Sequence, residues 1–192
     1  MAHGTRFFWL LIAVLLGASA FFGAGAESRR RAIQSSTILL HTGDVVRFSR
    51  ALDGDTVVVE RQDGQTAAVR IVGIKAFETK NDKDPTSRFG RAAADELSRR
   101  MRDEPIRVML QEPGRDRYGR ALAQLYVADE DIGLSLVSQG LALVYTVYPF
   151  AAMTLYIHEQ EAARGERRGL WADEESKRRA NLLAAAWRRQ SQ

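Results

Sequence analysis

The feature of the sequence that most restricts the fold is a pair of β-rich runs, residues 56–60 and 66–72, joined across Asp63-Gly64. β-branched side chains dominate the first run, as they do in strands. Asp-Gly is a dipeptide that tight type I′ turns prefer, and such turns connect antiparallel strands. We therefore expect a β-hairpin with a type I′ turn over this stretch.

Three charged residues flank the hairpin in a pattern that points to chemistry. Asp55 directly precedes the first run, Arg70 lies in the second, and Glu78 follows in the next loop. At one end of one sheet they would combine a carboxylate that can hold a metal ion, a guanidinium that can bind phosphate and a carboxylate that can deprotonate water. This is a minimal set for phosphodiester hydrolysis.

The rest of the chain alternates further strands with helices. Periodicity and turn residues predict strands at residues 43–49, 56–60, 66–72, 106–110 and 120–127. Helices are expected from Thr86 or Ser87 to before Pro105, at residues 134–139 and around residues 153–160. We therefore expect an α+β fold that is mainly β: a five-stranded OB-fold barrel with about three packed helices, preceded by an N-terminal hydrophobic helix.

The composition excludes several kinds of site. The chain of 192 residues has no cysteine, which rules out disulfides, zinc fingers, iron–sulfur clusters and thiol catalysis. Its three histidines, His3, His41 and His158, are far apart in sequence, which argues against a histidine-based metal site. The formal net charge of +4 is compatible with an anionic partner.

An uncharged apolar segment occupies residues 7–26, and its length suits a membrane-spanning helix or a signal peptide. The small residues 24–26 fit a cleavage pattern. We expect an exported protein that is secreted, periplasmic or membrane-anchored. The alternative is a single-pass protein whose domain faces the cytoplasm, because the three arginines at residues 29–31 outnumber the lone Arg6 on the other flank.

These observations divide the chain into four parts. Residues 1–26 form a signal peptide or membrane anchor, residues 27–42 a linker, residues 43–173 the barrel domain and residues 174–192 a basic amphipathic tail helix. The apolar face of the tail is expected to carry Leu182, Leu183, Ala186 and Trp187. The tail either packs on its own domain or touches anionic lipid or nucleic acid, and the sequence leaves both open.

Several short motifs resemble the staphylococcal nuclease (thermonuclease) family, in the order and at the spacing usual there. They are Asp53-Gly54-Asp55-Thr56, Arg70-Ile71-Val72-Gly73-Ile74, Glu78-Thr79, Asp116-Arg117-Tyr118-Gly119-Arg120-Ala121-Leu122-Ala123, Gly140-Leu141-Ala142 and Gly169-Leu170-Trp171. Together they cover residues 44–173, and an ordered set of this kind is far more specific than any single motif. The resemblance implies a nuclease-like OB-fold domain over residues 43–173.

The resemblance also implies roles for individual residues. Asp55 matches a carboxylate ligand of a catalytic calcium ion, and Glu78 matches the general base that acts on water. Arg70 and Arg120 match the two arginines that hold the scissile phosphate and stabilise the charge that develops during attack.

Three further matches concern substrate binding. Tyr118, and more loosely Tyr148, match tyrosines that line the nucleotide pocket. Arg117 stands where a basic residue contacts phosphate. The resemblance therefore implies a nucleic-acid partner, single-stranded DNA or RNA.

One position departs from the family pattern. The loop before the catalytic glutamate usually carries an aspartate that is the second carboxylate ligand, and here that position is Lys75. Positions 55, 75 and 78 then carry a net charge of −1 in place of −3. A unit charge about 4 Å from a divalent ion interacts by several kcal/mol at an effective dielectric constant near 20. Calcium or another divalent cation is therefore expected to bind weakly, or not at all.

Three outcomes for Lys75 follow. Its side chain could point away while a weaker metal site persists, its ammonium could stand where the metal would be, or the site could have lost catalysis. The expected function is hydrolysis of phosphodiester bonds in DNA or RNA by water that Glu78 activates. The alternative is a catalytically impaired domain that binds nucleic acid or a protein. We expect a monomer, with membrane association through residues 7–26.

Overall fold

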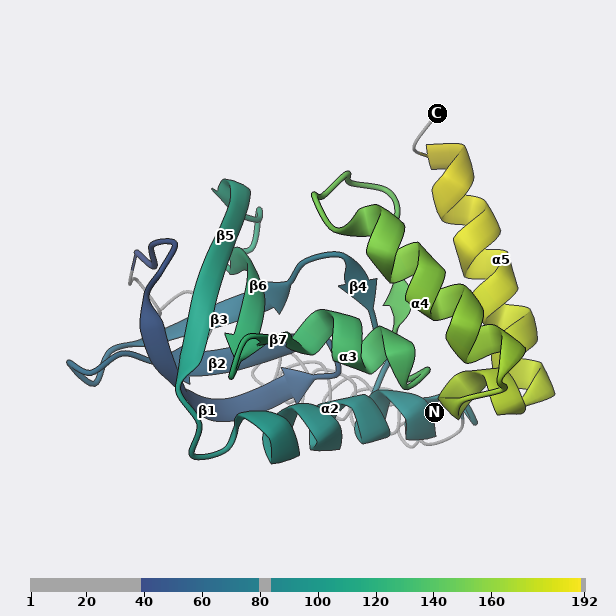
Figure 1. The fold of residues 1–192 in the computed structure, drawn as a ribbon, viewed down its shortest axis with the longest axis horizontal. Coiled ribbons are helices and arrows are strands. Elements are labelled where there is room, and N and C mark those ends of the chain that lie inside the picture. The colour runs from purple at the N-terminus through teal and green to yellow at the C-terminus, as the bar shows by residue number, and fades with distance from the viewer. Residues whose placement is uncertain (1–38, 80–83, 191–192) are drawn as a thin grey trace, which may run out of the picture. The chain divides into compact units, whose positions relative to one another are not determined.

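The computed structural model describes residues 39–79 and 84–190 (Figure 1). The chain divides into two units, residues 1–36 and 37–192, and the second is described below by itself. The expected leader and most of the expected linker lie outside the described residues. Within the part of the chain that is described, no helix is both long enough and apolar enough to cross a membrane.

A five-stranded barrel forms the centre of the domain. Its strands are β1 (Val45–Asp53), β2 (Thr56–Glu60), β3 (Thr66–Ile71), β5 (Ile106–Arg115) and β6 (Ala121–Val127). They are hydrogen-bonded in the order β3-β2-β1-β5-β6, and parallel pairing of β3 with β6 closes the barrel. Three two-residue strands lie outside it: β7 (Glu130–Asp131), β4 (Ile74–Lys75) and β8 (Leu143–Val144). The expected OB-type barrel is confirmed.

Within the described residues, four helices lie outside the barrel. Helix α2 (Ser87–Met101) follows the loop after β4 and runs beside β1 (Figure 1). Helix α3 (Ile132–Ser138) begins at Asp131, whose side chain caps it by accepting a hydrogen bond from the Leu134 N–H. Helix α4 (Met153–Gly165), the short 3₁₀ turn η1 (Gly169–Ala172) and helix α5 (Glu174–Gln190) complete the chain.

The core fills the barrel and the face that α2 covers. Val57, Val69 and Ile71 from the hairpin are fully buried. Ala93 and Leu97, spaced one helical turn apart on α2, are also fully buried against them. Ala93 and Leu97 therefore mark the face of α2 that packs on the barrel.

The tail of the sequence is the helix α5, and part of the predicted apolar face is wrong. Ala180 and Trp187 are buried, whereas Leu182 is exposed. The face that packs carries Ser176, Ala180 and Trp187, because Ala180 and Trp187 join the apolar cluster around Trp171. Two ion pairs lie at the start of the helix: Arg179 with Asp84, and Arg88 with Asp173. The helix therefore packs on its own domain.

The β2–β3 hairpin is present, but the predicted turn type is wrong. A type I′ turn needs positive φ at both central residues. Among the described residues of this loop, only Gly64 has a positive φ, of 79°. The Gly64 N–H donates to the carbonyl of Arg61, and the Arg61 N–H donates to the carbonyl of Gln65. The loop is therefore one residue longer than a two-residue turn and ends in a left-handed glycine.

Candidate active site

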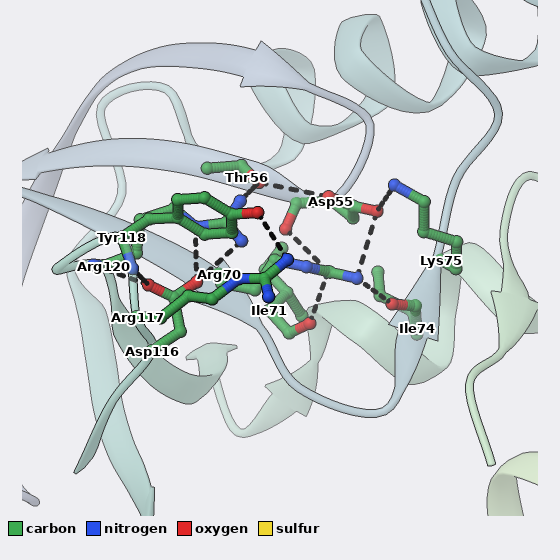
Figure 2. A network of polar contacts seen from close by, with 10 residues as sticks. All are labelled: Asp55, Thr56, Arg70, Ile71, Ile74, Lys75, Asp116, Arg117, Tyr118 and Arg120. Atoms are coloured by element: carbon green, nitrogen blue, oxygen red, sulfur yellow. Dashed lines mark hydrogen bonds and ion pairs between the residues drawn. The ribbon is translucent and has the colours of Figure 1, made fainter. Parts of the chain in front are cut away.

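Strand pairing gathers the candidate residues at one end of the barrel. The tight turn between β1 and β2 pairs Asp53 with Thr56, and Thr56 pairs in turn with Arg70 on β3. The parallel ladder between β3 and β6 places Arg70 opposite Leu122. Arg120, just before β6, is thereby brought to the same end (Figure 2).

Asp55 is the buried centre of this end, with 2% of its surface exposed. Its Oδ2 lies 3.2 Å from Arg70 Nη2 and 3.3 Å from Lys75 Nζ, and it accepts a 3.1 Å hydrogen bond from the Ala76 N–H. Its Oδ1 accepts a 3.1 Å hydrogen bond from the Thr56 hydroxyl. Burial by itself would raise the pKa of Asp55, but the charges of Arg70 and Lys75 outweigh it and lower that pKa. Asp55 is therefore a buried carboxylate that stays ionised.

Arg70 carries a positive charge and also cross-links the backbone through its N–H groups, a role that we call the brace. Its Nη1 donates to the carbonyls of Asp55 (3.1 Å) and Ile71 (2.8 Å), and its Nη2 donates to the carbonyl of Ile74 (2.6 Å). Its side chain is 13% exposed. The guanidinium therefore ties the β1–β2 turn to the chain that leads into β4, and its positive charge stays beside the site.

Arg120 is oriented by a residue that sequence reasoning did not single out. Asp116 Oδ2 accepts from Arg120 Nε at 2.8 Å and lies 2.7 Å from Nη2. Arg120 Nη1 donates to the Thr56 hydroxyl at 3.1 Å. Asp116 Oδ1 also accepts from the backbone N–H groups of Tyr118 and Arg120, which folds the turn between them. The only sequence signal for this role is an aspartate two residues before a tyrosine-glycine turn.

The predicted substrate residues Arg117 and Tyr118 lie together next to Arg120. Arg117 Nη2 donates to the Tyr118 hydroxyl at 2.7 Å. The guanidinium carbons of Arg117 and Arg120 lie 4.9 Å and 5.5 Å from the centre of the Tyr118 ring. The ring remains 51% exposed and so offers an aromatic surface beside two cations.

Tyr148, the other predicted pocket residue, belongs to a separate aromatic cluster. Its ring packs edge-on at 6.0 Å from Tyr145, which packs at 5.0 Å on Trp187 of α5. Burial raises the pKa of Tyr145, while the nearby charge of Arg70 acts to lower it. Tyr148 is 70% exposed, and its ring packs on Tyr145 and not on Tyr118 among the described residues. The aromatic surface of the site therefore has two parts.

Glu78 directly follows two residues, Ala76 and Phe77, whose positions are fixed by contacts with the domain. Ala76 is hydrogen-bonded to Asp55, and Phe77 is buried in the cluster that includes Trp171 and Trp187. Glu78 itself is exposed. A glycine on α2, Gly90, allows the helix to approach so closely that a Cβ there would lie 2.2 Å from the Phe77 carbonyl oxygen.

Gly90→Ala is therefore expected to destabilise the domain by about 1–2 kcal/mol, even though alanine favours helices over glycine. The added methyl group must push the Phe77–Glu78 backbone away from α2. Chemical denaturation measures the effect. Gly165→Ala on α4 is the matched control, because a Cβ there meets no atom within 4 Å and should leave stability unchanged or improved. Equal effects of the two variants would contradict the close packing.

The residues present do not fit a divalent cation in the family's manner. The Asp55 oxygen that faces Lys75 already has three positive or hydrogen-bonding partners. Burial, and then the Asp55 charge, raise the pKa of the neighbouring Asp53 to about 6. Among residues 39–79 and 84–190, no group of three or more acidic or histidine side chains is placed to hold a metal ion. Arg70 and Lys75 therefore already place positive charge beside Asp55 Oδ2.

Comparison with known proteins agrees with this geometry. The family model for staphylococcal nuclease homologues matches residues 68–173. An uncharacterized endonuclease of Haemophilus influenzae is 32% identical over 150 residues, which is 78% of this chain and 74% of that protein. A thermonuclease of Staphylococcus intermedius is 28% identical over 130 residues, 67% of this chain and 77% of that protein. Protein ParB of Escherichia coli is 32% identical over 158 residues, 78% and 80% of the two chains. The chain belongs to the staphylococcal nuclease family.

Proposed function

We propose that this protein is a nuclease that hydrolyses phosphodiester bonds in DNA or RNA. The observation that carries the proposal is a chain of contacts in which the Thr56 hydroxyl links Asp55 to Arg120, while Arg70 pairs with Asp55 (Figure 2). This arrangement concentrates guanidinium groups at one end of the barrel. The names of the thermonuclease and endonuclease relatives support the same reaction class.

The chemistry follows from the residues present. Glu78 takes a proton from water, and the water oxygen forms a bond to phosphorus as the bond from phosphorus to the leaving oxygen breaks. The leaving oxygen takes up a proton from solvent. Arg120 is held by Asp116 and Thr56, and it binds the nonbridging oxygens where negative charge grows.

The other residues divide between charge and substrate binding. Arg70 supplies a positive charge beside Asp55, while its N–H groups donate to the carbonyls of Asp55, Ile71 and Ile74. Arg117 adds a cation at the surface, and Tyr118 and Tyr148 offer exposed rings on which bases of a single strand can stack. An unpaired strand presents both its phosphates and its base faces to such a surface.

The test is turnover of end-labelled single-stranded DNA and RNA by the purified full chain, with products resolved on a denaturing gel. We expect cleavage of at least one of the two strands. A Glu78→Gln protein purified in the same way controls for contaminating nucleases. Salt-dependent binding of the strands without any cleavage would instead indicate the impaired binding module.

A further inference from the structure

Lys75 points into the site and not away from it. It lies in β4, where pairing with Leu143 on β8 fixes its backbone. From there its Nζ reaches to 3.3 Å from Asp55 Oδ2, the same oxygen that accepts the N–H of Ala76 (Figure 2). We propose that the Lys75 ammonium is the permanent cation of this site, so that cleavage needs no divalent metal. The inference rests on the proposed nuclease function.

The position of the ammonium suits contact with a phosphate. An ammonium carries three N–H donors. One donor can serve Asp55 Oδ2, which lies 3.3 Å from Nζ, and the other two can then serve oxygens of a bound phosphodiester. The Lys75 side chain is 39% exposed, compared with 13% for Arg70 and 20% for Arg120. Lys75 is therefore the most accessible of the three cations that surround Asp55 and Thr56.

The charge balance supports the same assignment. An aspartate at position 75 would give positions 55, 75 and 78 a charge of −3, and one divalent cation would bring this to −1. The residues of this chain carry −1 with no ion added. A phosphate that enters this site therefore meets the same net charge of −1 as in a site with three carboxylates and a divalent cation. Here the positive charge belongs to a side chain and not to a bound ion.

This assignment also defines what Lys75 does in the reaction. Its ammonium donates to a nonbridging phosphate oxygen and offsets the negative charge that grows there during attack. It transfers no proton, because Glu78 takes the proton of the attacking water. Asp55 holds the ammonium in place, and the charges of Arg70 and then Lys75 lower the pKa of Asp55 against the effect of burial.

Cleavage assays with chelator and with calcium test the inference on the full chain and three variants. The cleavage rate of the parent in chelator is expected to be within about twofold of its rate in calcium. Lys75→Asp should cut at least about 100-fold more slowly in chelator and recover with calcium, whereas Lys75→Gln should be slow in both. Lys177→Asp on α5 makes the same charge change away from the site and should behave as the parent.

Calcium binding gives a second readout that does not depend on turnover. In calorimetry with calcium chloride, Lys75→Asp should bind calcium and the parent should not. Calcium should likewise raise the melting temperature of Lys75→Asp alone. Lys75→Gln adds no carboxylate next to Asp55, so it keeps the comparison valid if Lys75→Asp folds poorly.

Two results would overturn the inference. One is a parent protein whose cleavage stops in chelator and returns with calcium. The other is a parent that binds calcium as tightly as Lys75→Asp does. If the parent cuts neither strand under any condition, the proposed function is wrong, and calorimetry alone then decides whether Lys75 replaces the cation.

Discussion

Glu78→Gln is expected to lower the rate of strand cleavage by about 10²- to 10⁴-fold, the range that a positioned general base contributes. Glutamine keeps the size and the hydrogen-bonding oxygen of the side chain but cannot accept the proton of the attacking water. Because Glu78 is exposed at the end of its loop, the substitution should leave folding intact. Strand affinity should stay within about twofold of the parent value, since the arginines and tyrosines are unchanged.

The measurement is the single-turnover cleavage rate with protein in excess, paired with strand binding by fluorescence anisotropy. Glu175→Gln, an exposed glutamate on α5, removes the same charge far along the chain and serves as control. A Glu78→Gln protein that keeps more than about a tenth of the parent rate would show that another group activates the water.

The barrel could be predicted from the sequence because its signals are local. β-branched runs and the left-handed Gly64 specify a hairpin wherever it is placed. The length of its turn could not be predicted, because the register that pairs Glu60 with Thr66 is set by burial of Val57, Val59 and Val69 in the barrel. Burial of these side chains therefore outweighs the preference of Asp63-Gly64 for a two-residue turn.

The site could be predicted only as far as short sequence motifs mark its residues. Asp55, Arg70 and Arg120 were found by motif spacing, and the structure brings them together. The brace role of Arg70 and the orienting role of Asp116 do not follow from the sequence, because each depends on the geometry of a turn. Arg70 reaches the carbonyl of Ile74 and Arg120 reaches Asp116, each four residues away, and no residue pattern specifies either contact. The exposure of Leu182 does not follow from the sequence either, because the buried face of α5 is set by the apolar cluster that Ala180 and Trp187 join.

Arg70→Gln is expected to destabilise the folded domain by about 3–5 kcal/mol, the cost of removing one partner of a buried ion pair. Asp55 has 2% of its surface exposed and would keep only the partly exposed Lys75 as a cationic partner. The carbonyls of Asp55, Ile71 and Ile74 would also lose donors, and glutamine is too short to replace them all. Urea denaturation measures the change, with the exposed strand residue Arg50→Gln as control.

A second substitution separates the charge from the hydrogen bonds. Adding Asp55→Asn to Arg70→Gln removes the carboxylate that the first change leaves without its partner. If that uncompensated charge is the main cost, the double variant should be no less stable than Arg70→Gln alone, and the two effects should be strongly non-additive. Additive losses would mean instead that Arg70 stabilises the domain chiefly through the three carbonyls. A loss below about 1 kcal/mol for Arg70→Gln would contradict the brace, leaving Arg70 free to act on phosphate alone.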